Sequence, residues 1–372
     1  MINNRHTSEI KLQSESFVLH TASEGRLYAH HPSIAHFKGK YYAVWSCGRV
    51  TEDDTGQFVM LSVSENGSEW SPPSPLIAPA DLGKPQGVIT AAGLYAGKDK
   101  LNLYFGCYEY LPQYVEQGQT RPQGDAHHQN TTLYVMTTAD GTAWNTPLDL
   151  NIPIVPNHPP QKTSSGRLII SGNISFPYTD DKNGIRGFNL SGIYGSYFDD
   201  TPYFDDSDSI WKVSAHNGWL DKGMLVCEGS FYQTDDKVIH MLLRTNTDRL
   251  WCTESRDDGA TWSTPFKTDF RTDASKFHFG RLPDGRFYAV GNFCFNGYKR
   301  DPLHLCLSSD GESFNTCYVL RDEPHTPFRA DSRKGGLYGY PHSLVHNGYL
   351  YVIYSKHKEE IEITRICLDD IK

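Results

Sequence analysis

Six polar or charged residues each stand at the beginning of a short apolar segment of the chain. They are His31, Gln86, His158, Glu228, Lys276 and Tyr340. If these segments are strands that converge on one axis, the six side chains line a common pocket. There an imidazole, a carboxylate and a phenol can exchange protons, and an ammonium group can hold an anion. Such a set suits acid–base chemistry on a polar substrate.

The segments that would position these residues have the pattern of β-strands. Runs such as 40–46 (KYYAVWS), 100–106 (KLNLYFG) and 349–355 (YLYVIYS) are short, rich in aromatic and β-branched residues, and preceded by turn sequences. This pattern predicts strands that are entered from hairpins. Almost no stretch has the apolar period of a helix, so we expect an all-β fold of the barrel, sandwich or propeller type.

A short repeat favours the propeller. Ser or Thr, then Asp or Asn, Gly and an aromatic residue follow an apolar strand at 64–70 (SENGSEW), 138–144 (TADGTAW), 255–262 (SRDDGATW) and 308–314 (SSDGESF). The polar side chains can bond turn amides, the glycine supplies a positive φ, and the ring can pack between neighbouring sheets. The second and third copies are about twice as far apart as the others, so one unit is expected to lack the motif.

These segments resemble Asp-boxes, the repeats of sialidase-type β-propellers. The resemblance implies a single six-bladed propeller over residues 1–372. Its blades are expected near 30–78, 85–152, 156–215, 223–270, 275–322 and 335–370, and a strand near 17–21 would complete the last blade and close the ring. The boxes themselves are turns, and we assign them no catalysis.

The resemblance to the sialidase family extends to the pocket. In that family a Glu opens the fourth blade and a pocket Arg follows it, as Glu228 and Arg244 do in this chain. A second pocket Arg precedes the strand that leads into a late Asp-box, which matches Arg300. A Tyr opens the last blade, which matches Tyr340.

An Asp on the loop after the first pair of inner strands is the acid/base residue in sialidases. Asp53 and Asp54 both stand at the matching place, and we favour Asp53. Sialidases also use a first pocket Arg at the opening of blade one, and here His31 stands where that Arg is expected. An imidazole is a weaker carboxylate partner than a guanidinium. Arg49 is close enough in sequence to substitute for it.

The resemblance therefore implies a retaining exo-α-sialidase-like glycoside hydrolase that releases a terminal carboxylated sugar. Tyr340 would attack the anomeric carbon while Glu228 takes its proton, and Asp53 or Asp54 would protonate the leaving oxygen. Arg244 and Arg300, aided by His31, would hold the carboxylate. Further substrate contacts are expected from Arg49, His158, Gln86 and Lys276. The partner would be an acidic glycan or oligosaccharide, and the mechanism requires no metal or organic cofactor.

Two other functions fit the same residues. A polysaccharide lyase or atypical glycosidase acting on uronate-containing glycans, such as rhamnose–glucuronate polymers, could use His31, His158, Tyr340 and Arg244 as its acid, base and cation. A noncatalytic glycan-binding propeller is the third alternative, because fold does not imply function.

The second blade offers more aromatic groups near the pocket. Tyr108, Tyr110 and Tyr114 are candidates for a wall against the rest of the glycan, and the pair His127–His128 is expected at the rim.

Composition excludes other classes of protein. The formal net charge of −9 without a basic run argues against nonspecific nucleic-acid binding. No apolar run approaches the roughly 20 residues of a membrane span, and the start has no apolar signal core, so a cytoplasmic location is expected, with a trimmed signal as the alternative. The eight cysteines are scattered without a CxxC, which favours small buried residues in a reducing compartment.

Overall fold

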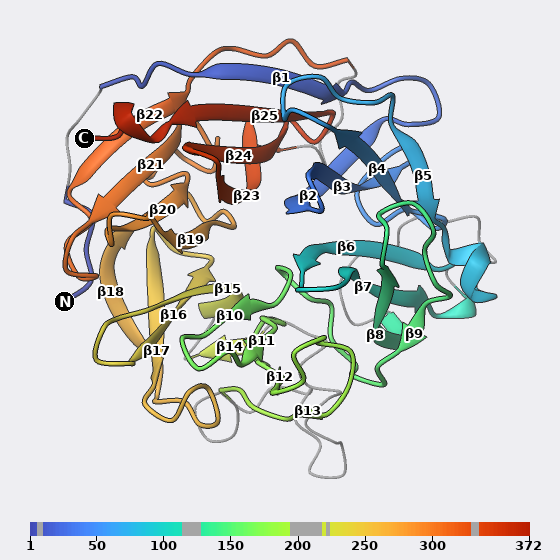
Figure 1. The fold of residues 1–372 in the computed structure, drawn as a ribbon, viewed down its shortest axis with the longest axis horizontal. Helices are drawn as coiled ribbons and strands as arrows, with labels where there is room; N and C mark the ends of the chain where they lie inside the picture. The colour runs from blue at the N-terminus through green and yellow to red at the C-terminus, as the bar shows by residue number, and fades with distance from the viewer. Residues whose placement is uncertain (6–9, 114–127, 194–217, 221–223, 329–334) are drawn as a thin grey trace.

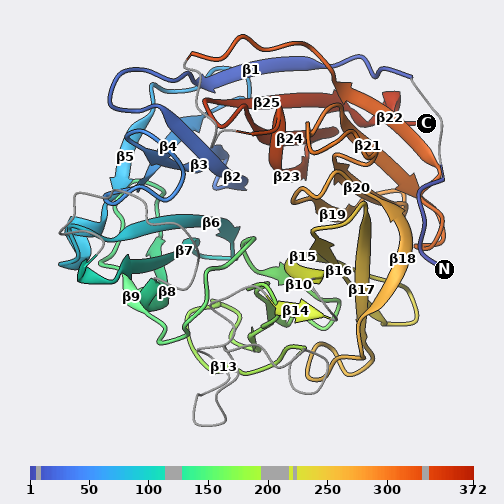
Figure 2. The ribbon, with the colours of Figure 1, turned by 180° about the vertical axis from the view of Figure 1, so that it is seen from behind.

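The computed structural model describes residues 1–5, 10–113, 128–193, 218–220, 224–328 and 335–372. In this part of the chain, 25 strands form six antiparallel sheets, which confirms the predicted all-β fold. Figures 1 and 2 show the sheets arranged in a ring, with one edge of each sheet toward the centre and the other toward the rim.

The first two sheets have the most regular strands. The first contains β2 (Tyr28–Phe37), β3 (Lys40–Gly48), β4 (Phe58–Ser64) and β5 (Ser74–Ile77), and the second contains β6 (Val88–Ala96), β7 (Leu101–Tyr110), β8 (His128–Thr138) and β9 (Leu148–Asp149). A 3₁₀ turn, η1 (Pro79–Leu82), connects them.

The third sheet is the least regular, and the fourth has an additional strand. The third contains β10 (Gln161–Lys162), β11 (Leu168–Ile169), β12 (Tyr178–Thr179) and β13 (Phe188–Asn189). The fourth contains β14 (Gly218–Leu220), β15 (Met224–Gln233), β16 (Ile239–Thr245), β17 (Arg249–Ser255) and β18 (Phe266–Arg271).

The last two sheets include both ends of the chain. The fifth contains β19 (His278–Arg281), β20 (Phe287–Gly291), β21 (Leu303–Ser308) and β22 (Thr316–Arg321). The sixth contains β23 (Tyr338–His346), β24 (Tyr349–Lys356) and β25 (Glu360–Cys367), followed by the 3₁₀ turn η3 (Leu368–Asp370), and β1 (Glu15–His20) is its outermost strand.

The ring is closed by strands from the two ends of the chain. Residues 15–20 pair antiparallel with β25, as the strand expected near 17–21 predicted. The closing strand runs along the outside of the sixth sheet in Figure 1. The sixth sheet thus joins the two ends of the chain, because its outermost strand comes from the N-terminal end and its other strands from the C-terminal end.

All four predicted box turns form. In each, the glycine amide donates to the Ser or Thr hydroxyl at 2.7–2.9 Å, and a carboxylate or amide oxygen of the Asp or Asn accepts the next turn amides. The ring that follows packs into the core: Trp70, Trp144, Trp262 and Phe314.

The box glycines lie against the neighbouring sheet. A Cβ on Gly141 would meet the Tyr42 hydroxyl of the first sheet at 1.8 Å, and one on Gly67 would meet Tyr351 of the sixth sheet at 2.9 Å. These close approaches connect each box to the sheet before it and fix the order of the sheets around the ring.

The missing box has a degenerate equivalent in the third sheet. Thr179 Oγ1 accepts the Asp181 amide at 3.0 Å, Asp181 Oδ2 accepts the Ile185 amide at 3.1 Å, and Tyr104 of the second sheet donates to the Gly184 carbonyl at 2.6 Å. In this turn Gly184 comes five residues after Thr179, and Gly187 stands where the boxes have their aromatic ring, so the sequence pattern does not detect it.

One cysteine pair departs from the sequence expectation. Cys306 and Cys317 face each other across β21 and β22 and form a disulfide. The other six cysteines are free. Among the described residues, no helix has the length and apolar character needed to cross a membrane.

Candidate active site

A cavity of about 210 Å³ receives one polar side chain from each of the six sheets or from the loops beside their inner strands. In sheet order these are His31, Thr90, Asn173, Glu228, Lys276 and Tyr340. Four of them are residues that the sequence placed at the pocket. A cavity lined by side chains from the whole ring depends on all six sheets being in place.

Local backbone kinks aim three of these side chains. The pairing register shifts between His30 and Ser33 in β2, between Cys227 and Gly229 in β15, and between Gly339 and His342 in β23. The residues within these bulges are His31 (φ 54°), Glu228 (φ 36°) and Tyr340 (φ 56°). A positive φ costs a non-glycine residue about 1–3 kcal/mol and is concentrated at functional sites. The strain is therefore placed where side chains enter the cavity.

Tyr340, Glu228 and Arg244 form one contact group. Arg244 Nη1 donates to the Tyr340 hydroxyl at 3.1 Å and also contacts Glu228 Oε2. Tyr340 is 7 % exposed, and the Glu228 side chain is 12 % exposed. The Arg244 guanidinium neutralises the buried Glu228 carboxylate. Without this partner, the buried negative charge would be strongly destabilising.

The electrostatics separate the protonation states of the phenol and the carboxyl group. Burial and the Glu228 charge raise the pKa of Tyr340 well above its ordinary value, although Arg244 opposes this. Burial alone would raise the pKa of Glu228, but the Arg244 and Lys276 charges and a hydrogen bond from Tyr340 lower it below its ordinary value. At neutral pH the phenol keeps its proton, and the carboxylate beside it can accept one.

Two more cations lie against the Tyr340 ring. Lys276 Nζ is 5.0 Å from the ring centroid and Arg300 Cζ is 5.7 Å from it. Burial lowers the pKa of Lys276 to about 8. Lys276 lines the cavity, whereas Arg300 does not belong to the cavity lining.

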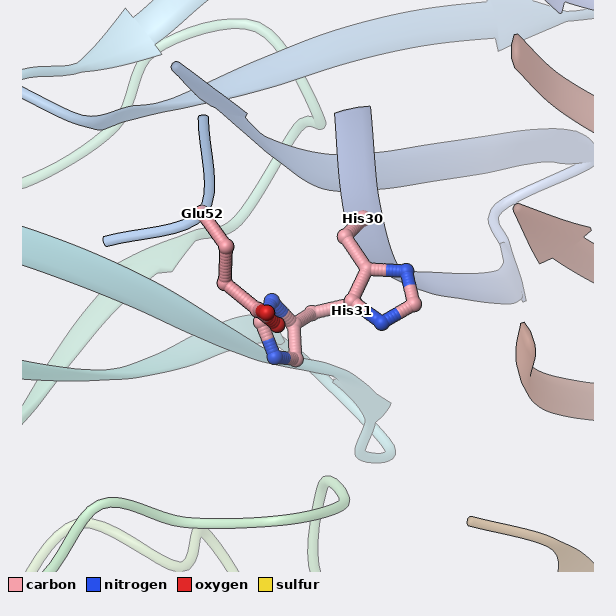
Figure 3. A group of neighbouring side chains, drawn as sticks. All are labelled: His30, His31 and Glu52. Carbon is pink, nitrogen blue, oxygen red and sulfur yellow. The ribbon is translucent and has the colours of Figure 1, made fainter. Parts of the chain in front are cut away.

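His30 and His31 also pack against Tyr340, with ring centroid distances of 4.0 and 5.0 Å. Burial and the Lys276 charge lower the pKa of His31 to about 3, and burial lowers the pKa of His30 well below its ordinary value. Both rings are therefore neutral at physiological pH. Figure 3 shows Glu52 pointing toward them from the loop after β3.

Asp53 and Asp54 have different environments. Asp54 is fully buried, and its Oδ2 accepts the Val50 and Thr51 amides at 2.8 and 3.0 Å. Asp53 lines the cavity, where a hydrogen bond and the charge of its carboxylate raise the pKa of the buried Tyr108 beyond the effect of burial. Asp54 thus holds its own loop together, and Asp53 faces the space that a substrate would occupy.

With this geometry established, comparison with known families identifies the chain's relatives. The model of the BNR repeat-like domain matches residues 39–352, most of the chain. The chain belongs to the BNR repeat-like family. Comparison with curated proteins finds no match.

Solved structures share the fold of this BNR-repeat protein at low sequence identity. A Dyadobacter fermentans protein of unknown function has 17% identity and a TM-score of 0.67, and the alignment covers 96% of this chain and 99% of that one. The NanB sialidase of Streptococcus pneumoniae (K499G mutant) has 13% identity and a TM-score of 0.65, covering 95% and 71%. The Trypanosoma rangeli sialidase has 13% identity and a TM-score of 0.65. The alignment covers 96% of this chain and 60% of the T. rangeli chain.

Some residues of the BNR-repeat protein that the sequence placed at the pocket lie elsewhere. Arg49 and Gln86 are exposed and do not belong to the cavity lining. Gln86 lies two positions before the first residue of β6, outside the strand. His158 is buried outside the lining, where its Nε2 lies 2.8 Å from the Phe277 carbonyl oxygen and its ring packs beside His278. Their positions give them no contact with a ligand in the cavity.

Other pocket residues were missed or only partly predicted. Thr90 and Asn173 occupy the places expected for Gln86 and His158, and Glu52 was not singled out. Tyr108 and His128 line the second-sheet wall as stacked rings 3.9 Å apart, in agreement with the aromatic wall suggested for that blade. Tyr110 packs beside them, whereas Tyr114 and His127 lie outside the described residues.

Proposed function

We propose that this BNR-repeat protein is a retaining exo-glycosidase of the sialidase type, built on a six-bladed propeller and acting on a terminal carboxylated sugar. The observation that carries the proposal is the Tyr340–Arg244–Glu228 group, in which a phenol, a guanidinium and a carboxylate meet in one buried cavity. The T. rangeli sialidase, which shares the fold, has been solved as a covalent intermediate with 2,3-difluorosialic acid.

Tyr340 is the nucleophile in this proposal. A neutral phenol approaches an anionic sugar without the repulsion that a carboxylate nucleophile would meet, and sialidases are the tyrosine exception among glycosidases. The Tyr340 oxygen bonds to the anomeric carbon while its proton passes to Glu228, which is ionised beforehand. Once Glu228 is protonated it is uncharged, so the Arg244 guanidinium is available to the substrate carboxylate.

Asp53 is the acid and base. It donates a proton to the glycosidic oxygen as the leaving group departs, then takes a proton from water in the second step. Water attacks the anomeric carbon, the bond to Tyr340 breaks, and Glu228 returns the proton to the phenolate. The cycle leaves every residue in its starting state.

Lys276 complements Arg244 in holding the carboxylate. His31 is uncharged near neutral pH, so it cannot supply the positive charge that an arginine in its place would carry. The ammonium group of Lys276 points into the same cavity and is 3 % exposed. We assign it the charge that the sialidase pattern places at blade one.

A uronate lyase is the second candidate. The neutral His31 ring meets Tyr340 edge-on at 5.0 Å, so an uncharged base stands beside a phenol within a cationic cavity. Elimination from a uronate needs such a base, an acid and carboxylate neutralisation. It also leaves an unsaturated product that absorbs ultraviolet light, which hydrolysis does not.

The test is a panel of chromogenic sialosides and uronides, followed by both chromophore release and ultraviolet absorbance. Tyr340→Phe and Glu228→Gln should each lower sialoside turnover by at least about 100-fold, the usual range for loss of acid–base or nucleophilic help. Tyr298→Phe is the matched control, because Tyr298 is 55 % exposed and outside the cavity. Full turnover by Tyr340→Phe would rule out the mechanism, and release of unsaturated uronate would favour the lyase. Binding without turnover on every substrate would favour a glycan-binding protein.

A further inference from the structure

Two adjacent histidines of β2, His30 and His31, have their rings close together. Successive side chains of a regular strand point to opposite faces, so neighbours do not normally meet. Here the bulge between His30 and Ser33 and the positive φ of His31 bring the two imidazole rings to 4.7 Å. Glu52 approaches the same point from the loop after β3 (Figure 3).

The three side chains have ligand atoms within reach of one another. One atom each from His30, His31 and Glu52 lies within 4.8 Å of the other two, and among the residues that the structure describes this is the single such group. Ligands bound about 2.0–2.2 Å from a tetrahedral ion are roughly 3.3–3.6 Å apart. Small side-chain rotations would close the difference.

Two ring nitrogens of this group are buried without a hydrogen-bond partner, His30 Nε2 and His31 Nδ1. The other nitrogen of His30, Nδ1, lies 2.5 Å from Ser355 Oγ, whose own proton is directed to the Gly339 carbonyl at 3.3 Å. In the tautomer with the proton on Nδ1, His30 donates to Ser355 and keeps a lone pair on Nε2. An outer partner that fixes the tautomer in this way is typical of metal-binding histidines.

The Glu52 carboxylate is also held in orientation. Oε2 accepts from Lys358 Nζ at 2.7 Å, and Oε1 accepts from the Tyr28 hydroxyl at 3.3 Å. Hydrogen bonds to a ligating carboxylate commonly accompany a metal site.

We propose that His30, His31 and Glu52 hold one divalent transition-metal ion of the zinc class on the cavity wall beside Tyr340. Two imidazoles and one carboxylate are a known three-ligand set for zinc, and the fourth ligand would be an oxygen atom from the cavity, of water or of an anionic group. Such an ion would place positive charge where His31 replaces the expected arginine, a consequence that rests on the proposed function.

The surrounding cations give the proposal a second signature. Lys276 and Arg300 also lie near the Tyr340 ring, and Lys358 bonds directly to Glu52. The ammonium of Lys276 acts on both His30 and His31. Because like charges repel, Lys276→Met should tighten metal binding, whereas it should weaken binding of a carboxylated sugar.

The test needs no substrate, so its failure is distinct from failure of the glycosidase proposal. Full-length protein stripped with a chelator is titrated with ZnCl₂ by calorimetry and with CoCl₂ by visible absorption. We expect one site per chain with a tetrahedral cobalt spectrum. His31→Gln and Glu52→Gln should each lower the metal affinity at least about 100-fold. Loss of a residue that only orients a ligand costs up to about 100-fold, and loss of a ligand itself should cost at least as much.

The matched control is His346→Gln. His36 of β2 and His346 of β23 are a stacked histidine pair, with centroids 3.7 Å apart, outside the cavity lining. This variant should bind zinc and cobalt like the wild type. Absence of binding by the wild type, or binding undiminished in both His31→Gln and Glu52→Gln with melting temperatures near the wild-type value, would overturn the proposal.

Discussion

The Tyr340 hydroxyl accepts a hydrogen bond from Arg244 Nη1 at 3.1 Å, across 96 residues of sequence. The same nitrogen contacts Glu228, so one guanidinium orients both the proposed nucleophile and its base. The bulges in β15 and β23 that carry Glu228 and Tyr340 make this meeting geometrically feasible.

Arg244→Lys should therefore disable the site although it keeps the charge. A lysine is a point charge that cannot contact both partners and the substrate carboxylate as a planar guanidinium can. Loss of a charge-assisted contact costs about 1.5–3 kcal/mol, which corresponds to a roughly 10- to 150-fold lower kcat/KM. Steady-state kinetics on the best sialoside measure this. Arg281→Lys, at an exposed ion pair with Asp235, is the control and should retain activity.

Lys276 should give the enzyme an alkaline limit. Its pKa, lowered by burial to about 8, leaves the side chain charged below that pH and neutral above it. Since a carboxylated substrate needs the charge, KM should rise about tenfold between pH 7 and pH 9. In Lys276→Arg the guanidinium stays charged, so the rise should disappear. An unchanged alkaline limb in that variant would exclude Lys276 as its source.

Asp53 and Asp54 should separate into a chemical and a structural residue. Asp53→Asn should slow substrates with poor leaving groups by about 100-fold or more and spare activated aryl glycosides, because only the former need a proton from the enzyme. Asp54→Ala removes the acceptor for two amides and should lower the free energy of unfolding by about 1–3 kcal/mol. Kinetics with two leaving groups measure the first effect, and denaturant unfolding measures the second. If Asp54 were the acid/base instead, its variant would show the kinetic loss and the Asp53 variant would not.

The box turns should contribute packing between sheets as well as turn geometry. Gly141 (φ 82°) and Gly39 (φ 82°) share a backbone conformation, but only at Gly141 would a Cβ meet a neighbour. Gly39→Ala should cost about 1–2 kcal/mol from the backbone alone. Gly141→Ala should cost about 1–3 kcal/mol more, because it forces Tyr42 away. Equal losses in urea unfolding would show that the contact between sheets adds no stability.

The sequence predicted the residues whose positions follow from local pattern. Glu228 and Tyr340 lie near the beginning of strands that are recognisable by their own composition, and the resemblance to the sialidase family implied their place at the pocket. The prediction for Gln86 did not place it correctly, because a shift of a few residues along the strand decides which side chain reaches the cavity. No local sequence pattern shows that register. The prediction for His158 did not place it correctly either, because the strands of the third sheet have only two residues each. Strands this short leave too little sequence pattern to show which residue faces the cavity.

Other contacts between residues distant in sequence could not be predicted. Glu52 bonds to Lys358 across 306 residues, and neither residue has a neighbour in sequence that indicates the pairing. The bulge that brings the His30 and His31 rings together is likewise a result of pairing between strands. These features create the cluster beside Tyr340, and only the folded chain shows them.

The most direct test of the proposed mechanism is to trap the sugar on the enzyme. The wild type is incubated with 2,3-difluorosialic acid, then digested and analysed by peptide mass spectrometry. The account predicts one sugar on the peptide that contains Tyr340, and none in Tyr340→Phe. An adduct on another residue, or sialoside hydrolysis by a protein that never forms one, would contradict it.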